Sequence, residues 1–93
     1  MFEKLKRKVG KTIKLVFNGI KFKVEIKWRD AFMEEILVII DPEEYKENFE
    51  GFVVQLLITQ NNKIFIHTPI FSSTEEIKEE RSLIKALKNE GIL

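Results

Sequence analysis

The chain has 93 residues, no cysteine and a formal net charge of +1, and 33% of its residues are charged. We expect this length to form one small globular domain over residues 1–93, built around a single core. The lack of cysteine excludes disulfides, thiolate nucleophiles and cysteine-based zinc sites, and it favours a reducing compartment.

The hydrophobic stretches of the sequence are short. The longest apolar run, Ile36–Ile40, falls far below the roughly 20 residues that a membrane-spanning helix needs. Residues Met1–Lys8 are charged, unlike the apolar stretch that a signal peptide requires. We therefore expect a soluble, cytoplasmic protein.

The charge is distributed unevenly along the chain. Residues 1–29 hold ten Lys and Arg and two Glu, whereas residues 30–93 hold six bases and thirteen acids, so these parts carry net charges of +8 and −7. Such asymmetry indicates a half that faces a polyanion, or two halves that neutralise each other when folded. The Lys- and Glu-rich composition is also a trend of hyperthermophile proteins, which cover their surfaces with ion pairs.

The first expected element is a short amphipathic helix over Met1–Val9, with Phe2, Leu5 and Val9 on one side. Nine residues form a marginal helix unless tertiary contacts support it. A basic amphipathic helix can also lie on an anionic membrane, but this segment offers Phe2 as its one large apolar anchor. A membrane partner is therefore not favoured.

Two alternating segments, Thr12–Phe17 and Ile20–Trp28, flank Asn18-Gly19. Asn-Gly is the preferred type I′ turn because both of its residues need positive φ, so the sequence predicts a two-residue β-hairpin. This turn length fixes the register. One face then pairs Phe17 with Ile20, Leu15 with Phe22 and Ile13 with Val24. The other face pairs Val16 with Lys21, Lys14 with Lys23 and Thr12 with Glu25.

The middle of the chain is expected to continue with a strand and a helix. Glu35–Ile40 is rich in β-branched residues and indicates a buried strand. Asp41 followed by Pro42 is typical of a helix start, with Asp41 as the N-cap and acids in the first turn. This short helix is expected to end by Gly51.

Phe52–Thr59 and Lys63–Thr68 predict a second hairpin around Gln60-Asn61-Asn62, with strands apolar enough to be covered on both faces. A C-terminal helix is expected over Thr74–Glu90, and Ser73 with Glu76 would form its capping box. Its buried stripe comprises Ile77, Leu83, Ile84 and Leu87. Gly91 would supply the left-handed stop, with Ile92 folding back on Leu87.

The fold class predicted from these elements is α+β. We expect a five-stranded, antiparallel-rich sheet built from two hairpins, with the C-terminal helix packed on one face and short helices elsewhere.

The first hairpin carries the candidate binding site, which comprises Lys14, Lys21, Lys23, Lys27 and Arg29. Lys14 and Lys23 should be direct cross-strand neighbours, an arrangement that destabilises a sheet when both residues have the same charge. A two-stranded ribbon fits the DNA major groove, and Lys neutralises phosphates without reading bases. The alternative is a solvated face chosen for solubility and edge protection, or one covered by the acidic C-terminal helix.

Two further candidates for binding or catalytic residues are better explained as parts of the folded structure. Trp28 and Phe32 near Arg29 would make a platform for stacking bases, but strand alternation favours Trp28 in the core. His67 is the only histidine, and we expect it to be partly buried and hydrogen-bonded on the face that also carries Phe65.

We expect no catalytic residue, metal site or cofactor. A small chain commits its apolar side chains to one core and leaves little depth for a pocket. The strongest exception is a metal-dependent nuclease, in which Asp30, Asp41 and nearby Glu residues would have to converge from different elements.

Two functions follow from these patterns. The first is a small non-enzymatic nucleic-acid-binding accessory protein that uses the basic hairpin, with DNA and RNA both open as the ligand. The second is a protein-binding module, such as an inhibitor or adaptor from a mobile element, because oppositely charged surfaces favour fast and selective protein association. That module could also self-associate, for example as a homodimer, either basic face to acidic face or edge strand to edge strand.

Overall fold

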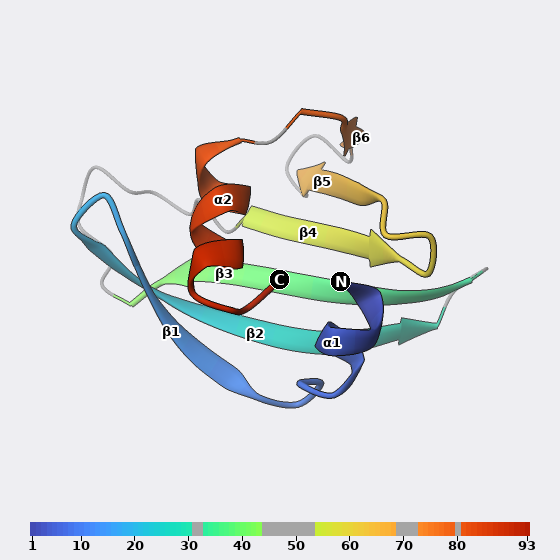
Figure 1. Cartoon of the computed structure of the whole chain (residues 1–93), viewed down its shortest axis with the longest axis horizontal. Helices are drawn as coiled ribbons and strands as arrows, with labels where there is room; N and C mark the ends of the chain where they lie inside the picture. The colour runs from blue at the N-terminus through green and yellow to red at the C-terminus, as the bar shows by residue number, and fades with distance from the viewer. Residues whose placement is uncertain (31–32, 44–53, 69–72, 80) are drawn as a thin grey trace.

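The computed structural model describes residues 1–30, 33–43, 54–68, 73–79 and 81–93. Within these residues six strands form one antiparallel sheet in the order β1-β2-β3-β4-β5-β6, and two short helices lie on the same face of it (Figure 1). In chain order the elements are α1 (Phe2–Lys6), β1 (Thr12–Phe17), β2 (Ile20–Asp30), β3 (Glu34–Pro42), β4 (Val54–Thr59), β5 (Ile64–Thr68), β6 (Ser73–Ile77) and α2 (Ser82–Asn89). The α+β class is confirmed, but the described part of the sheet has six strands instead of five. Among the described residues no helix is long and apolar enough to cross a membrane.

The first hairpin forms with the predicted register. Asn18 and Gly19 have φ values of 51° and 74°, as a type I′ turn requires. The cross-strand partners run from Phe17 with Ile20 to Thr12 with Glu25, and Lys14 faces Lys23. β2 continues to Asp30 and pairs along its length with β3.

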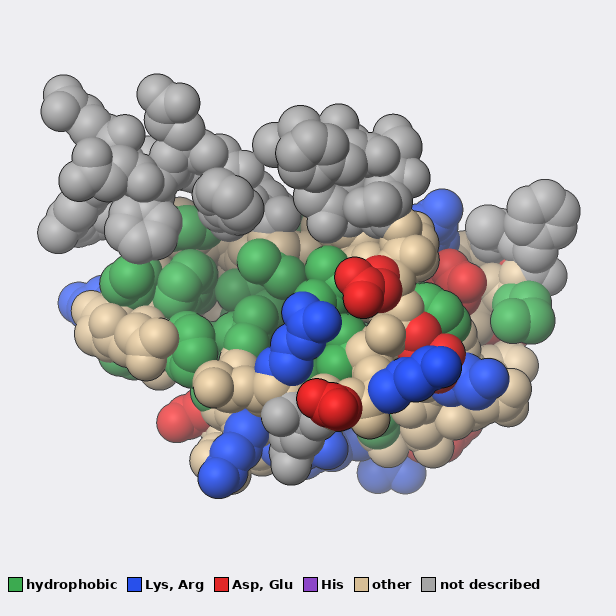
Figure 2. All heavy atoms as spheres, turned by 90° about the horizontal axis from the view of Figure 1, so that it is seen from above, with side chains coloured by type: hydrophobic (Ala, Val, Ile, Leu, Met, Phe, Trp, Pro, Cys, Tyr) green, Lys and Arg blue, Asp and Glu red, His purple; other side chains and the backbone are tan. Residues whose placement is uncertain are grey.

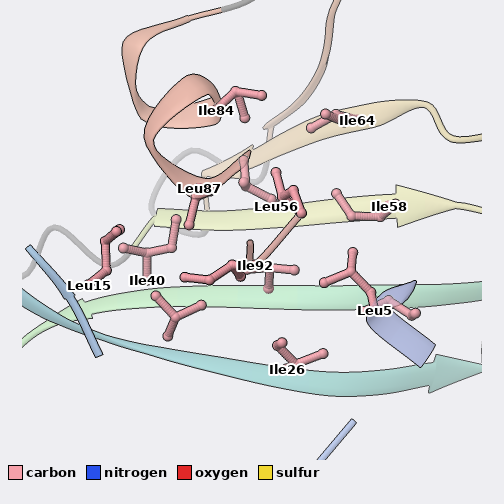
Figure 3. Packing of buried hydrophobic residues seen from close by; sticks show 14 of the residues in the cluster. Leu5, Leu15, Ile26, Ile40, Leu56, Ile58, Ile64, Ile84, Leu87 and Ile92 are labelled. Atoms are coloured by element: carbon pink, nitrogen blue, oxygen red, sulfur yellow. The ribbon is translucent and has the colours of Figure 1, made fainter. Parts of the chain in front are cut away.

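The core lies between the sheet and the two helices. We call the sheet face that α1 and α2 cover the inner face, and the opposite face the outer face. Alternate strand residues point inward, and the central ones are fully buried against the helices (Figure 3). They include Leu15, Val24, Ile26, Ile36, Val38, Ile40, Leu56 and Ile58, which meet Leu5 of α1 and Leu87 of α2.

The end of α2 has the expected left-handed cap. Gly91 has a φ of 72°, its N–H donates to the carbonyl of Lys88 (3.0 Å), and the N–H of Ile92 donates to that of Leu87 (2.9 Å). This pair of bonds is the Schellman motif, which brings the residue after the glycine back onto the last turn. Ile92 and Leu87 are accordingly both buried in the core.

The helix expected to begin at Asp41 does not begin there. β3 continues through Asp41 and Pro42, whose Cα partners on β2 are Lys23 and Phe22. The N–H of Glu43 then donates to the carbonyl of Lys21 at 2.9 Å. Pairing with β2 overrides the local helix-start signal, and the rest of that expected helix, as far as Gly51, lies outside the described residues.

The C-terminal helix is shorter than predicted, because the first four residues of the expected helix belong to a strand. Ser73–Ile77 forms β6 beside β5, and the helix begins at Ser82. Glu76 is opposite Phe65 across this strand pair, so it cannot complete a capping box with Ser73. Strand pairing satisfies the open edge of β5, while Ile77 still packs against the core.

The remaining boundaries differ by a few residues. α1 ends at Lys6, and Val9 lies beyond it with 36% of its surface exposed instead of in the core. The second hairpin forms as predicted over Val54–Thr59 and Ile64–Thr68, with Asn62 at a φ of 60° in its turn. Residues 52–53 of the expected strand lie outside the described residues.

Candidate nucleic-acid interface

Five basic residues point from β1 and β2 to the outer face. This set, here called the basic face, comprises Lys14, Lys21, Lys23, Lys27 and Arg29. Their alternation with inward-facing residues places four of them along β2, and the hairpin register places Lys14 beside them. All five are exposed. α2 lies on the inner face and so does not cover them (Figure 1).

Lys14 and Lys23 are the most closely spaced pair on this face. Phe17 and Ile20 flank the two-residue turn and form its hydrogen-bonded pair, so alternation makes Lys14 and Lys23 a non-hydrogen-bonded pair. The Cα atoms of such pairs lie about 4.5 Å apart, closer than in hydrogen-bonded pairs. Two ammonium groups with this placement repel each other and destabilise the hairpin.

The far end of the basic face is partly neutralised. Lys27 Nζ lies 3.5 Å from Glu25 Oε2, and Arg29 Nε lies 3.9 Å from Glu35 Oε2. Both are surface ion pairs, which contribute little stability but reduce the local positive potential.

The end near the turn is different, because Lys14, Lys21 and Lys23 form no ion pair within the described part of the chain. Asp41 is the Cα partner of Lys23 on β3, so one carboxylate stands on the outer face beside this group. The remaining excess of positive charge therefore gathers around Lys14 and Lys21.

The basic face also carries an apolar residue that sequence reasoning did not single out. Val16 lies directly opposite Lys21, and 62% of its surface is exposed. The hairpin register already implied this position, since it placed Val16 on the same face as the lysines.

Trp28 does not form a platform with Arg29, because the two side chains point to opposite faces of β2. Trp28 lies on the inner face, as alternation predicted, but 37% of its surface is exposed at the edge of the core. Its ring centroid lies 6.0 Å from that of Phe2 and 5.8 Å from Lys6 Nζ. Phe32 lies outside the described residues.

His67 fits the structural interpretation. It is partly buried on the outer face, on the same side of β5 as Phe65, and its Nδ1 lies 3.2 Å from Thr74 Oγ1 on β6. This hydrogen bond links the last two strands.

The carboxylates do not converge into a metal site in the described ranges. No group of three or more His, Asp or Glu residues there is arranged to hold a metal ion. Asp30 lies seven positions from Lys23, the partner of Asp41, so the two aspartates stand roughly 23 Å apart along the sheet. Asp30 and Asp41 are therefore too far apart to bind the same metal ion.

Lys8 is basic, but its ammonium group makes contacts within the protein and is not part of the basic face. Its Nζ donates hydrogen bonds to the carbonyl oxygens of Gly91 and Ile92, the second at 3.4 Å. Lys4 Nζ donates to the carbonyl of Leu93 at 3.5 Å. Burial lowers the pKa of the Lys8 ammonium, and the charges of Lys4 and Lys11 lower it further. Sequence reasoning missed these contacts because they join residues more than 80 positions apart.

Comparison with protein-family models, with curated proteins and with solved structures finds no match to this chain. Its function has to be inferred from the geometry and charge of the basic face.

Proposed function

We propose that this protein binds the phosphate backbone of nucleic acid through the basic face, without catalysing a reaction. The observation that supports this most directly is the Lys14–Lys23 pair, with Lys21 beside it and no ion pair for any of the three among the described residues. Like charges at this spacing cost folding stability. A bound polyanion would offset that repulsion.

The spacing of the lysines suits closely spaced phosphates. Lys21 and Lys23 are two positions apart on one face of β2, which separates their Cα atoms by about 6.7 Å. Lys14 extends the group across the strand pair. Duplex DNA carries one charge per roughly 1.7 Å of helix axis. Flexible ammonium groups contact these phosphates as point charges, so we expect weak sequence selectivity.

The salt dependence of binding gives a quantitative expectation. Three neutralised phosphates predict that log K falls with log salt concentration at a slope of about −2.7 on duplex DNA. Engagement of Lys27 and Arg29 as well would steepen the slope toward about −4.5. Because these two residues already pair with Glu25 and Glu35, we expect the shallower value.

Filter binding of a labelled duplex and a labelled single-stranded RNA at several salt concentrations tests the proposal. We expect Lys14→Glu combined with Lys23→Glu to abolish most of the binding and flatten the slope. Lys63→Glu combined with Lys85→Glu is the matched control, because it changes the net charge equally at exposed positions away from the basic face. Equal losses in both double variants, or none in the first, would contradict the proposal.

The absence of catalysis has its own test. Incubating both labelled nucleic acids with Mg²⁺ or Mn²⁺, with an EDTA control, should leave the strands intact. Metal-dependent cleavage that Asp41→Asn abolishes would show an enzyme instead of a binding protein. We place the protein in the cytoplasm, where a chain without cysteine suits the reducing conditions.

A protein-binding module is the second candidate, and the exposed Val16 favours it. A phosphate backbone needs no apolar contact, whereas a protein interface combines apolar and charged side chains. A pull-down from the native host, with and without nuclease, separates the two candidates. Recovery of nucleic acid alone, lost after nuclease treatment, would exclude the protein-binding module.

A further inference from the structure

We infer that copies of this chain associate head to tail through the two edges of the sheet, with β1 of one copy beside β6 of the next. Both strands are edges of the sheet in the described part of the molecule. An edge strand presents a row of backbone N–H and C=O groups toward solvent, and these groups form a template for another strand.

The direction of the strands suits this pairing. All five neighbouring pairs are antiparallel, so β1 and β6, at opposite ends of a six-stranded sheet, run in opposite directions. A second copy displaced along the sheet, with the same face outward, therefore places its β6 antiparallel to β1. The antiparallel pattern then continues through the contact without a reversal of faces.

The charges on the two edges are complementary. Lys14 lies on the outer face of β1, and Glu76 lies on the outer face of β6, opposite Phe65. In the register that places Lys14 opposite Glu76, these two side chains form an opposite-charge cross-strand pair, which is stabilising. Pairing two β1 strands would instead gather lysines, and pairing two β6 strands would gather Glu75 and Glu76. Repulsion between like charges thus selects the head-to-tail contact.

The register set by Lys14 opposite Glu76 pairs two apolar residues on the inner face, and on the same face it places Glu75 opposite Leu15. Antiparallel pairing from that point places Val16 opposite Thr74 and Ile13 opposite Ile77. Ile13 and Ile77 are partly buried residues at the rim of the core, so their contact would extend the core across the interface. Val16, 62% exposed in one copy, would be covered by the neighbouring strand.

β6 is partly open to solvent, since Thr74 and Glu75 on it are exposed. An open cleft of about 580 Å³ runs beside it, lined from Thr74 to Ile77 and by Lys78, Glu79 and Arg81. Seen from above, on the side where β6 lies in Figure 1, a group of hydrophobic side chains stands next to acidic and basic ones (Figure 2). Both edges are short, six residues in β1 and five in β6, so we expect weak association. Salt should weaken it further by screening the attraction between the charged side chains.

Sedimentation velocity on nuclease-treated protein measures this association separately from nucleic-acid binding. At low salt we expect the average mass to rise with concentration above the 11.0 kDa of one chain. It should not stop at a dimer, because a head-to-tail contact leaves an open edge on every new copy. In about 1 M salt, where the Debye length falls to roughly 3 Å, the mass should return toward one chain. A single 11.0 kDa species at every concentration and salt would overturn the inference.

A charge exchange identifies the contact. Lys14→Glu and Glu76→Lys should each weaken association about tenfold, since each replaces an attractive pair with a repulsive one. Both changes in one chain restore an opposite-charge pair and should restore association. Lys85→Glu, an exposed site on α2, is the control for net charge. Association that none of these variants changes, or that the double variant fails to recover, would overturn the inference. Because Glu76 is not on the basic face, its effect does not depend on the proposed nucleic-acid binding.

Discussion

Two groups of lysines in the first third of the chain have opposite relations to the fold. Lys4 and Lys8 donate hydrogen bonds to carbonyl oxygens after α2, and Lys6 lies over the ring of Trp28. Lys14 and Lys23, by contrast, face each other across the hairpin without an ion pair among the described residues. The first group stabilises the contact between the two ends of the chain, whereas the second opposes folding. The repulsion between Lys14 and Lys23 is therefore the basis on which we propose the basic face as a binding site.

The largest effect should come from the apolar contacts of α1, the helix that carries Lys4 and Lys6. Leu5 is completely buried between α1 and the sheet, so Leu5→Ala should lower the free energy of unfolding by about 3 kcal/mol. Urea denaturation measures this loss. Val9→Ala, close in sequence but at a 36% exposed residue, should cost less than 1 kcal/mol, on the order expected for a surface substitution. Equal costs at both positions would show that α1 does not pack as described.

The hairpin that carries the second group was predictable because its structure is local. Asn18-Gly19 sets the turn, the turn sets the register, and the register places Lys14 opposite Lys23. No distant residue is needed at any of these steps. The candidate site could therefore be predicted together with the hairpin.

The segments around Asp41 and Ser73 could not be predicted in the same way. Each carries a local helix-start signal, and each pairs with a strand that the local sequence does not reveal: β2 for Asp41 and β5 for Ser73. Local helix propensity predicts the structure of a segment poorly when a strand from elsewhere in the chain is available to pair with it. The same limit applies to the charges, because Glu35 reaches Arg29 from β3 only in the folded sheet.

A single substitution within the second group separates a binding role from a solvated surface. Lys14→Glu replaces repulsion with Lys23 by attraction, so it should raise the free energy of unfolding by about 0.5–1 kcal/mol. The same change should weaken nucleic-acid binding, because it removes one phosphate contact and adds a repulsive charge. Urea denaturation and filter binding measure the two effects.

Lys14→Gln is the control for this comparison, since it removes the repulsion without adding a negative charge. We expect it to give an intermediate gain in stability and an intermediate loss of binding. If both variants were more stable and bound nucleic acid as well as the unaltered chain, the basic face would be only a solvated surface.

The smallest expected effect concerns Lys8 and its titration. Its pKa is lower in the folded protein than in the unfolded chain, chiefly because of burial and secondarily because of Lys4 and Lys11. Between these two pKa values the unfolded chain binds more protons, so the free energy of unfolding contributed by Lys8 increases as pH rises through that window. The window ends at the ordinary lysine value of 10.5.

Urea denaturation at several pH values below and within this window, for the unaltered chain and for Lys8→Met, isolates the contribution. Lys8→Met keeps much of the aliphatic stem but removes the ammonium and its bonds to Gly91 and Ile92. The variant should therefore lose the rise with pH that the unaltered chain shows, and it should be less stable at neutral pH because those carbonyl bonds are gone. Lys85→Met, at an exposed position on α2, is the control for the loss of one lysine. A steeper rise in Lys8→Met than in the unaltered chain would mean that the ammonium of Lys8 is stabilised in the folded state, opposite in sign to the effect of its burial.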